Sequence, residues 1–428
     1  MDGVNVSWKT AMAAALAAAS LLACGRGEGT PEARLEREVR ERVPQVEKAT
    51  GLKFKQPPKV EARSKAEVRQ FLLRKFDESQ PAQELAGEEA ALKLFGLVPD
   101  TLKLRDLMVS FYEEQIVGFY DPKTKVLYVV EGGPDDQRGI VITHELVHAL
   151  QDQYVNLDSI MRFQGDADRT TAAQAVIEGH ATYEQFKIMS GGGANIAARI
   201  PGGWDRVRQL IRDNRQTAPV FAAAPVVIQE AALFPYLSGA DFVHRFREQR
   251  PTANLLERFP TSTEQVLHTS AYFDAKPDQP TRVTLAAPAG GTRVHESNMG
   301  EFGVRIFLYE HTGNFPAALE AAAGWDGDRY VVVQTPKGNA LGWVTVWDSP
   351  LDAAQFVEQL EAAVRRRYAA GDPVALTGDA KRWRAQGRAL VVTPGEIGGR
   401  TVVLYVDAPD GTEGTILDLA NVRLEGSN

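Results

Sequence analysis

The stretch HELVH, residues 144–148, combines side chains that can bind a metal ion and use it in catalysis. Residues four positions apart lie on one face of an α-helix, so the imidazoles of His144 and His148 would be neighbours. Glu145 would be rotated about 100° from His144 around the helix axis. Two such imidazoles can bind zinc, and a carboxylate beside an open coordination position can act as a general base. The spacing therefore predicts a zinc site with Glu145 beside the ion.

The residues around this motif favour a packed helix. The preceding segment GIVIT, residues 139–143, is apolar and β-branched, and Val147, Ala149 and Leu150 continue the apolar side. The alternative is that both histidines lie on the exposed stripe of an amphipathic helix and bind nothing. The apolar surroundings make the metal site the better interpretation.

A catalytic zinc ion usually has three protein ligands, so the two histidines need a partner. The strongest candidate is Glu178 in IEGHA, 30 positions after His148 on the next predicted helix. Gly179 and Ala181 are small enough to let that helix approach the first one closely. His180 is the rival ligand, but a helix turns about 100° per residue, so Glu178 and His180 point to nearly opposite faces.

HELVH together with EGHA resembles the zincin metallopeptidases, specifically the glutamate-zincin branch, in which a glutamate on a second helix completes the site. The segments at residues 111–129, 234–243, 260–268 and 321–330 are similar to a family of bacterial lipoprotein-like metallopeptidases. The resemblance therefore covers the chain from about residue 105 to 330. It implies a zincin-like metallopeptidase domain that binds one Zn²⁺ per chain through His144, His148 and Glu178. It also implies that Glu145 activates a zinc-bound water for peptide-bond hydrolysis.

Two departures from thermolysin-like enzymes stand out. The interval between the second histidine and the glutamate is longer here, and Thr182 stands where those enzymes have an aspartate four residues after the glutamate. That aspartate usually orients a ligand histidine. Asp152, one turn beyond His148, is a candidate replacement, although an exposed residue at this spacing is more often only part of the surface.

Zincins commonly stabilise the oxyanion with a His or Tyr from outside the zinc helices. His268 in STEQVLH is the first candidate here, and Tyr236 in FPY is the second. Alternating residues around a turn at Asp121 and Pro122 predict a hairpin. Its first strand, with residues 118–120, resembles the edge strand on which zincins bind peptides. Gly118 and Tyr120 would bind a substrate by strand addition, unless Gly118 is only a bulge or turn glycine.

The N-terminal residues predict export and a membrane anchor. Residues 1–23 contain an Ala/Leu-rich run that is too short to span a bilayer but suits a signal peptide. LLAC, residues 21–24, resembles a bacterial lipobox, which implies lipidation of Cys24. A plain signal peptide with an incidental cysteine is the alternative. We expect an exported bacterial lipoprotein held at a membrane and facing the periplasm or the exterior.

The chain is predicted to be an α+β protein of several parts. After a signal peptide at 1–23 we expect a tether at 24–45, a zincin catalytic subdomain at 46–200, a mostly helical C-terminal subdomain at 201–323 that completes the cleft, and a small α+β C-terminal lobe at 324–428. The formal net charge of −8 and the pI near 5.6 provide no basic surface for nucleic acid. We therefore expect no nucleic-acid partner.

These observations predict a zinc-dependent metallopeptidase at the bacterial cell envelope, acting on a peptide or protein substrate. The alternative is a non-catalytic envelope lipoprotein, structural or ligand-binding, that retains a zincin scaffold. Glu145 favours the enzyme, because a purely structural zinc site would not need a carboxylate beside an open position.

Overall fold

The computed structural model describes residues 31–79, 82–131, 135–160, 163, 165–191, 206, 209 and 218–425. The predicted signal peptide at 1–23 and Cys24 lie outside the described residues. The predicted tether at 24–45 is described only from residue 31, where helix α1 begins. Residues 31–45 belong to α1 and do not form a tether. Leu35 and Val39, on one face of α1, pack in the same core cluster as residues of the helix that bears His144 and His148.

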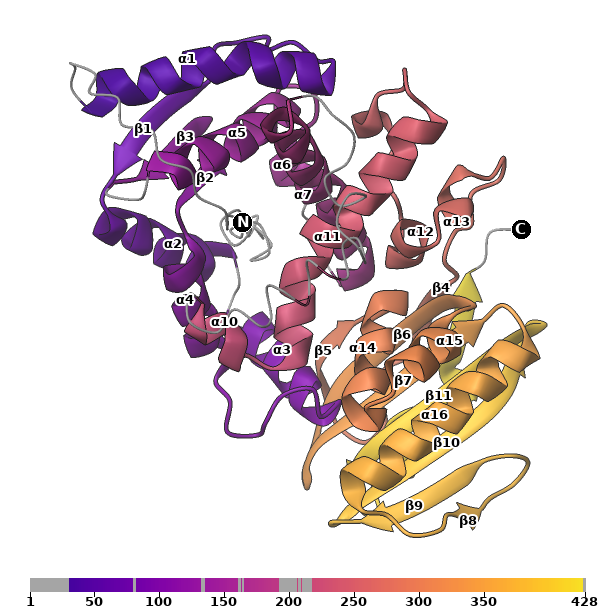
Figure 1. Cartoon of the computed structure of the whole chain (residues 1–428). Coiled ribbons are helices and arrows are strands. Elements are labelled where there is room, and N and C mark those ends of the chain that lie inside the picture. The colour runs from indigo at the N-terminus through magenta and orange to yellow at the C-terminus, as the bar shows by residue number, and fades with distance from the viewer. Residues whose placement is uncertain are drawn as a thin grey trace.

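The chain is an α+β protein with a mainly helical N-terminal half and a C-terminal half built on one large sheet (Figure 1). The elements of the N-terminal half are α1 (Pro31–Thr50), β1 (Lys59–Arg63), α2 (Lys65–Ser79), α3 (Ala82–Leu94), α4 (Leu104–Gln115), β2 (Gly118–Asp121), β3 (Val126–Val130), α5 (Asp135–Gln151), α6 (Leu157–Ile160), α7 (Ala167–Met189), α10 (Pro219–Ala223), α11 (Val226–Gln249), α12 (Thr263–Leu267) and α13 (Thr269–Phe273).

The predicted hairpin is present and forms part of a small sheet next to α5. Strands β2 and β3 pair antiparallel with Gly118 opposite Val129, and β1 pairs parallel with β3 on its other side. The order β1-β3-β2 leaves β2 at an edge among the described strands. The edge strand expected from the sequence is therefore an edge strand in the fold.

Helix α7 is buried between α5 and α11, and its small residues explain how. A Cβ on Gly179 would lie 2.1 Å from the backbone carbon of Gly239 on α11, and a Cβ on Gly239 would lie 2.0 Å from the carbonyl oxygen of Ala175. Gly179 therefore allows close contact with α11, and not with α5 as the sequence suggests. Ala181, about 200° further around α7, packs in the α5 cluster.

Gly239→Ala is expected to destabilise the fold by about 3 kcal/mol, because the new methyl group would overlap the backbone of α7 at Ala175. Gly371→Ala is the matched control. Gly371 has nothing within 4 Å of a built Cβ, so its change is expected to be about 0.5 kcal/mol or less. Urea unfolding of both variants provides the comparison. Equal midpoints for the two variants would show that the α7–α11 contact tolerates a side chain.

The C-terminal half is a seven-stranded sheet in the order β5-β6-β7-β11-β10-β9-β8, with antiparallel pairing throughout. Helices α14, α15 and α16 pack on one face, and the β4–β12 pair packs on the other. Its elements are β4 (Arg282–Leu285), β5 (Thr292–Ser297), α14 (Gly300–Thr312), α15 (Phe315–Ala322), β6 (Trp325–Thr335), β7 (Gly338–Trp347), α16 (Pro350–Tyr368), β8 (Val374–Ala375), β9 (Lys381–Ala385), β10 (Arg388–Ile397), β11 (Arg400–Pro409) and β12 (Val422–Glu425).

This half begins before residue 324, where the sequence places its boundary. Strand β5 is the edge strand of the large sheet, although its residues fall in the range expected to be mostly helical. The difference has a physical cause: the residues of β5 are largely exposed, so they lack the buried alternation by which a strand is recognised.

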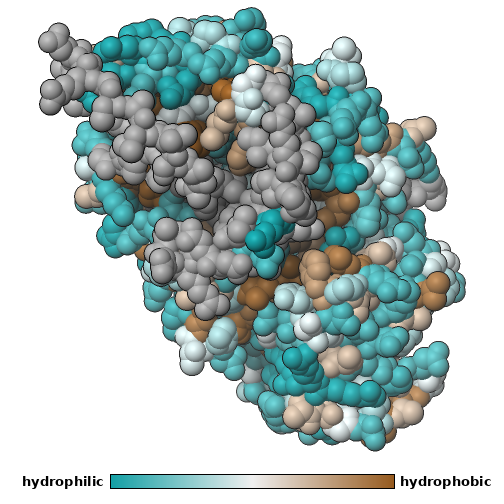
Figure 2. Space-filling model, in the orientation of Figure 1, coloured by the Kyte–Doolittle hydropathy of each residue, from teal (hydrophilic) through white to brown (hydrophobic). Residues whose placement is uncertain are grey.

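The surface seen in Figure 2 is mostly hydrophilic, and hydrophobic surface gathers near the junction of the two halves. Five large hydrophobic side chains are exposed in the described residues, each on its own element, and such scattered exposure is ordinary for a folded domain. Within the described parts of the chain, none of the helices has both the length and the apolar character needed to cross a membrane.

Candidate metal centre

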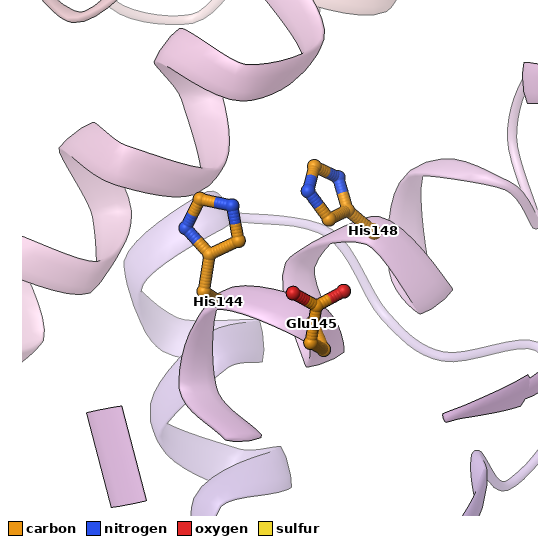
Figure 3. Close-up of side chains that lie close together, drawn as sticks. All are labelled: His144, Glu145 and His148. Carbon is orange, nitrogen blue, oxygen red and sulfur yellow. The ribbon is translucent and has the colours of Figure 1, made fainter. Parts of the chain in front are cut away.

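Helix α5 presents His144, Glu145 and His148 as the sequence predicts, and all three side chains are buried. Their residues are 1%, 3% and 8% exposed. The two imidazoles project to the same side of α5, with ring centroids 4.8 Å apart, and the Glu145 carboxylate lies beside them (Figure 3). The histidines are therefore not on an exposed polar stripe. Burying this many polar groups is costly unless they are paired or bind an ion.

Glu178 on α7 faces both histidines. Its Oε2 atom lies 3.2 Å from His144 Nε2 and 3.3 Å from His148 Nε2. Its other oxygen, Oε1, is buried and accepts no hydrogen bond from any described residue. Two imidazole nitrogens and a carboxylate with an unsatisfied buried oxygen are a donor set that suits zinc. The structure thus brings together the three residues that the sequence proposes as ligands.

Two glutamines orient the histidines, and sequence reasoning missed both. His144 Nδ1 lies 2.9 Å from Gln185 Oε1, and His148 Nδ1 lies 2.8 Å from Gln151 Oε1. An amide oxygen can only accept, so each Nδ1 carries a proton and each Nε2 is left for a ligand. The available signal was spacing: Gln151 is three residues after His148, and Gln185 is two turns after Glu178.

These contacts also replace the role considered for Asp152. Its carboxylate instead accepts from the Tyr120 hydroxyl at 2.7 Å and from Lys125 Nζ at 2.6 Å. Gln151 is the residue of this segment that reaches His148, and its Nε2 donates to the carbonyl oxygen of Ile177 at 2.9 Å. One of the links from α5 to α7 therefore passes through the neutral amide of Gln151.

His180 points away from this cluster. Its Nδ1 lies 3.1 Å from Gln151 Nε2, and its Nε2 lies 3.3 Å from an Arg247 nitrogen and 3.7 Å from a Glu184 oxygen. Its imidazole is therefore held in a polar network with α11. This placement follows from the roughly 200° between positions 178 and 180 and favours Glu178 as the third ligand.

The charges at the centre depend on one another. Burial by itself would raise the pKa of Glu178, but His148 and His144 outweigh it and hold that pKa at about 2. Burial would likewise lower the pKa of His148, yet the Glu178 carboxylate raises it to about 9. Burial raises the pKa of Glu145. Without a metal ion, His148 and Glu178 thus form an imidazolium–carboxylate pair.

Zinc binding at pH 7.5 is expected to release at least one proton, because His148 must lose its proton to become a ligand. Its pKa near 9 means that the proton is present below pH 9 and that zinc affinity falls as the pH falls. Calorimetry in two buffers of different ionisation enthalpy measures the release. In Glu178→Gln, burial of His148 is no longer opposed by that carboxylate, so the release should be much smaller. Equal release in parent and variant would contradict the coupling.

Glu145 connects the centre to the edge strand. Its Oε2 accepts the backbone N–H of Tyr120 at 2.8 Å. In an antiparallel pair, alternate residues direct their backbone N–H and C=O groups away from the partner strand. Because the N–H of Tyr120 points away from β3 towards Glu145, the backbone groups of Gly118, two residues earlier, point to the same outer side of β2. The absent side chain of Gly118 has a different role. A Cβ there would lie 2.7 Å from Val141 Cγ1, so this glycine lets α5 pack on the sheet.

His268 does not lie at this centre, contrary to the expectation from the sequence. It ends α12, and its Nε2 lies 2.8 Å from Glu301 Oε1 and 3.0 Å from an Arg305 nitrogen. Tyr236, the second candidate, is buried on α11 with its ring stacked 6.0 Å from that of His144. Tyr236 is therefore the candidate that the fold brings to the histidines.

Comparison with known proteins matches the other half of the chain. A family described as a domain of unknown function (DUF8575) matches residues 284–418, about a third of the chain. The match covers the large sheet and its helices and includes none of the residues of the metal centre. No curated protein matches the chain, and no solved structure matches it.

Proposed function

We propose that this chain is a zinc-dependent metallopeptidase of the glutamate-zincin type, with the N-terminal half as a zincin-like catalytic domain. One observation carries the proposal: His144, His148 and Glu178 converge from two helices while Glu145 stands beside them, bound to an edge strand. His144, His148 and Glu178 would hold one zinc ion. When bound, zinc lowers the pKa of a water molecule towards 7 and polarises a carbonyl oxygen.

The protein's own residues supply the proton transfers and the positioning. Glu145 accepts a proton from the attacking water and delivers it to the leaving amine. Burial raises its pKa, which brings the carboxylate closer to the pH at which such transfer is efficient. Gln151 and Gln185 hold the histidine rings in one tautomer. Tyr236, whose ring stacks on that of His144, would stabilise the oxyanion through its hydroxyl.

A peptide substrate would extend the small sheet along the outer edge of β2. Main-chain groups of Gly118 and Tyr120 would form hydrogen bonds with the peptide backbone. These bonds provide affinity whatever the side chains of the substrate are. Tyr120 N–H must then exchange Glu145 for substrate, so peptide binding frees the Glu145 carboxylate for catalysis. Cleavage of a peptide library by the zinc-loaded protein tests this activity. Absence of any cleavage above that of the metal-depleted protein would refute it.

We further propose that the protein is an exported lipoprotein, on the evidence of LLAC after an Ala/Leu-rich run. Cys24→Ser is expected to move the protein from the membrane fraction to the soluble fraction, or to leave its signal peptide uncut, because the thiol carries the lipid. Stable anchoring needs about two acyl chains. Detergent partitioning of parent and variant measures the effect. If both partition equally into detergent, the anchor lies elsewhere.

A further inference from the structure

A second group of acidic side chains lines a cavity of about 600 Å³ at the junction of the two halves. Glu264 comes from α12, Asp278 from the segment after α13, and Asp348 from the residue that follows β7. One carboxylate oxygen from each lies within 4.8 Å of the others. Residues from both halves of the chain therefore meet at one point.

The burial of Glu264 distinguishes this cluster from a chance group of acidic side chains on the surface. Glu264 is only 6% exposed and lines the cavity. Among the described residues, its carboxylate has no hydrogen-bond donor and no salt-bridge partner. A largely buried carboxylate without a donor is stabilised by a cation, by a proton or by water that reaches it through the cavity.

The nearby basic groups leave this charge uncompensated. Arg400 lines the same cavity but pairs with Asp326, whose carboxylate also accepts from Thr281. Lys276 is exposed, and it makes no salt bridge with the cluster in the part of the chain that the structure describes. Burial and neighbouring carboxylates, first Asp278, raise the pKa of Glu264 to about 9. Glu264 therefore holds a proton at neutral pH, and a cation bound by the cluster would displace that proton.

We propose that Glu264, Asp278 and Asp348 bind a calcium ion that joins the two halves of the protein. The ligands are all oxygens, which hard cations prefer. The three oxygens lie within 4.8 Å of one another, so all three can contact one ion. An irregular cluster that is open to water suits Ca²⁺, which accepts about six to eight oxygens in flexible geometry, better than Mg²⁺, which demands a near-ideal octahedron. Asp278 and Asp348 are exposed, so water can complete the coordination.

The position of this ion gives it a structural role. Asp348 belongs to the region matched by the DUF8575 family, whereas Glu264 and Asp278 precede it. An ion held by all three would tie α12 and the segment after α13 to the end of β7. Because binding to the folded state alone stabilises that state, calcium should raise the melting temperature of the protein.

The test is thermal unfolding of the purified full chain in metal-depleted buffer, with and without about 5 mM CaCl₂. Calcium is expected to raise the Tm by about 2–4 °C, and the same concentration of MgCl₂ to raise it less. Glu264→Gln and Asp348→Asn should remove the calcium response. In calcium-free buffer Asp348→Asn should melt above the parent, because it removes a charge that Asp278 repels. Asp274→Asn, an exposed cavity residue outside the cluster, is the matched control and should keep the response.

Repeating the thermal unfolding experiment with His144→Ala distinguishes this site from the proposed zinc centre. That variant should still be stabilised by calcium. The proposal is overturned if the parent shows no calcium response, or if Glu264→Gln and Asp348→Asn respond as the parent does. A response lost in His144→Ala would also overturn it, by assigning calcium to the other centre. Because Asp348 is exposed, its variant keeps the test decisive if Glu264→Gln folds poorly.

Discussion

Glu145→Gln is expected to lower peptide turnover by about 10²–10⁴-fold while the protein still binds one zinc ion. The amide has the same shape and can still accept the N–H of Tyr120, so the local structure should persist. It cannot accept a proton from water at neutral pH, so the proton transfer is lost. Turnover of a cleaved peptide, with zinc content measured on the same sample, tests both parts.

Glu248→Gln is the matched control, because Glu248 is a glutamate on the surface of α11 whose side chain is 64% exposed. It should retain the activity and zinc content of the parent. Loss of zinc in Glu145→Gln would make Glu145 a ligand instead of a base. Full activity in Glu145→Gln would refute the proposed mechanism, and a parent that binds zinc without hydrolysing any peptide would favour the non-catalytic scaffold.

Glu178→Ala is expected to weaken zinc binding by orders of magnitude, and His144→Ala and His148→Ala to abolish it. Glu178 Oε2 lies within 3.3 Å of both imidazoles, so its removal takes away a ligand and the negative charge that offsets the ion. A competition titration with a coloured zinc chelator measures the affinity. Metal content alone would miss a large loss of affinity if zinc is in excess.

His180→Ala is the discriminating variant. It should keep zinc affinity close to that of the parent, although it should lower stability because it leaves Glu184 and Arg247 without their histidine. Affinity is therefore expressed per folded molecule, with the folded fraction taken from circular dichroism. Zinc retained in Glu178→Ala but lost in His180→Ala would point to three histidine ligands and remove the glutamate-zincin assignment.

The sequence by itself predicted which residues of α5 form the candidate metal centre, because the signals are local. A helix turns about 100° per residue, so His144, Glu145 and His148 had known relative directions before any tertiary contact was considered. The same geometry separated Glu178 from His180 on α7. The hairpin before α5 could also be predicted, because its alternating apolar and polar residues and its turn residues lie within one short segment. These features depend on neighbours in the chain.

Tertiary structure decided what depends on distant residues. His268 and Tyr236 both suited an oxyanion role by residue type, and only the packing of α11 against α7 places Tyr236 beside His144. Packing likewise directed Gly179 towards α11 and not α5. Gln185 reaches His144 across 41 positions of the chain. Spacing within one helix carries no information about which side chain of another helix will lie opposite, because that depends on the volumes of all the residues packed between them.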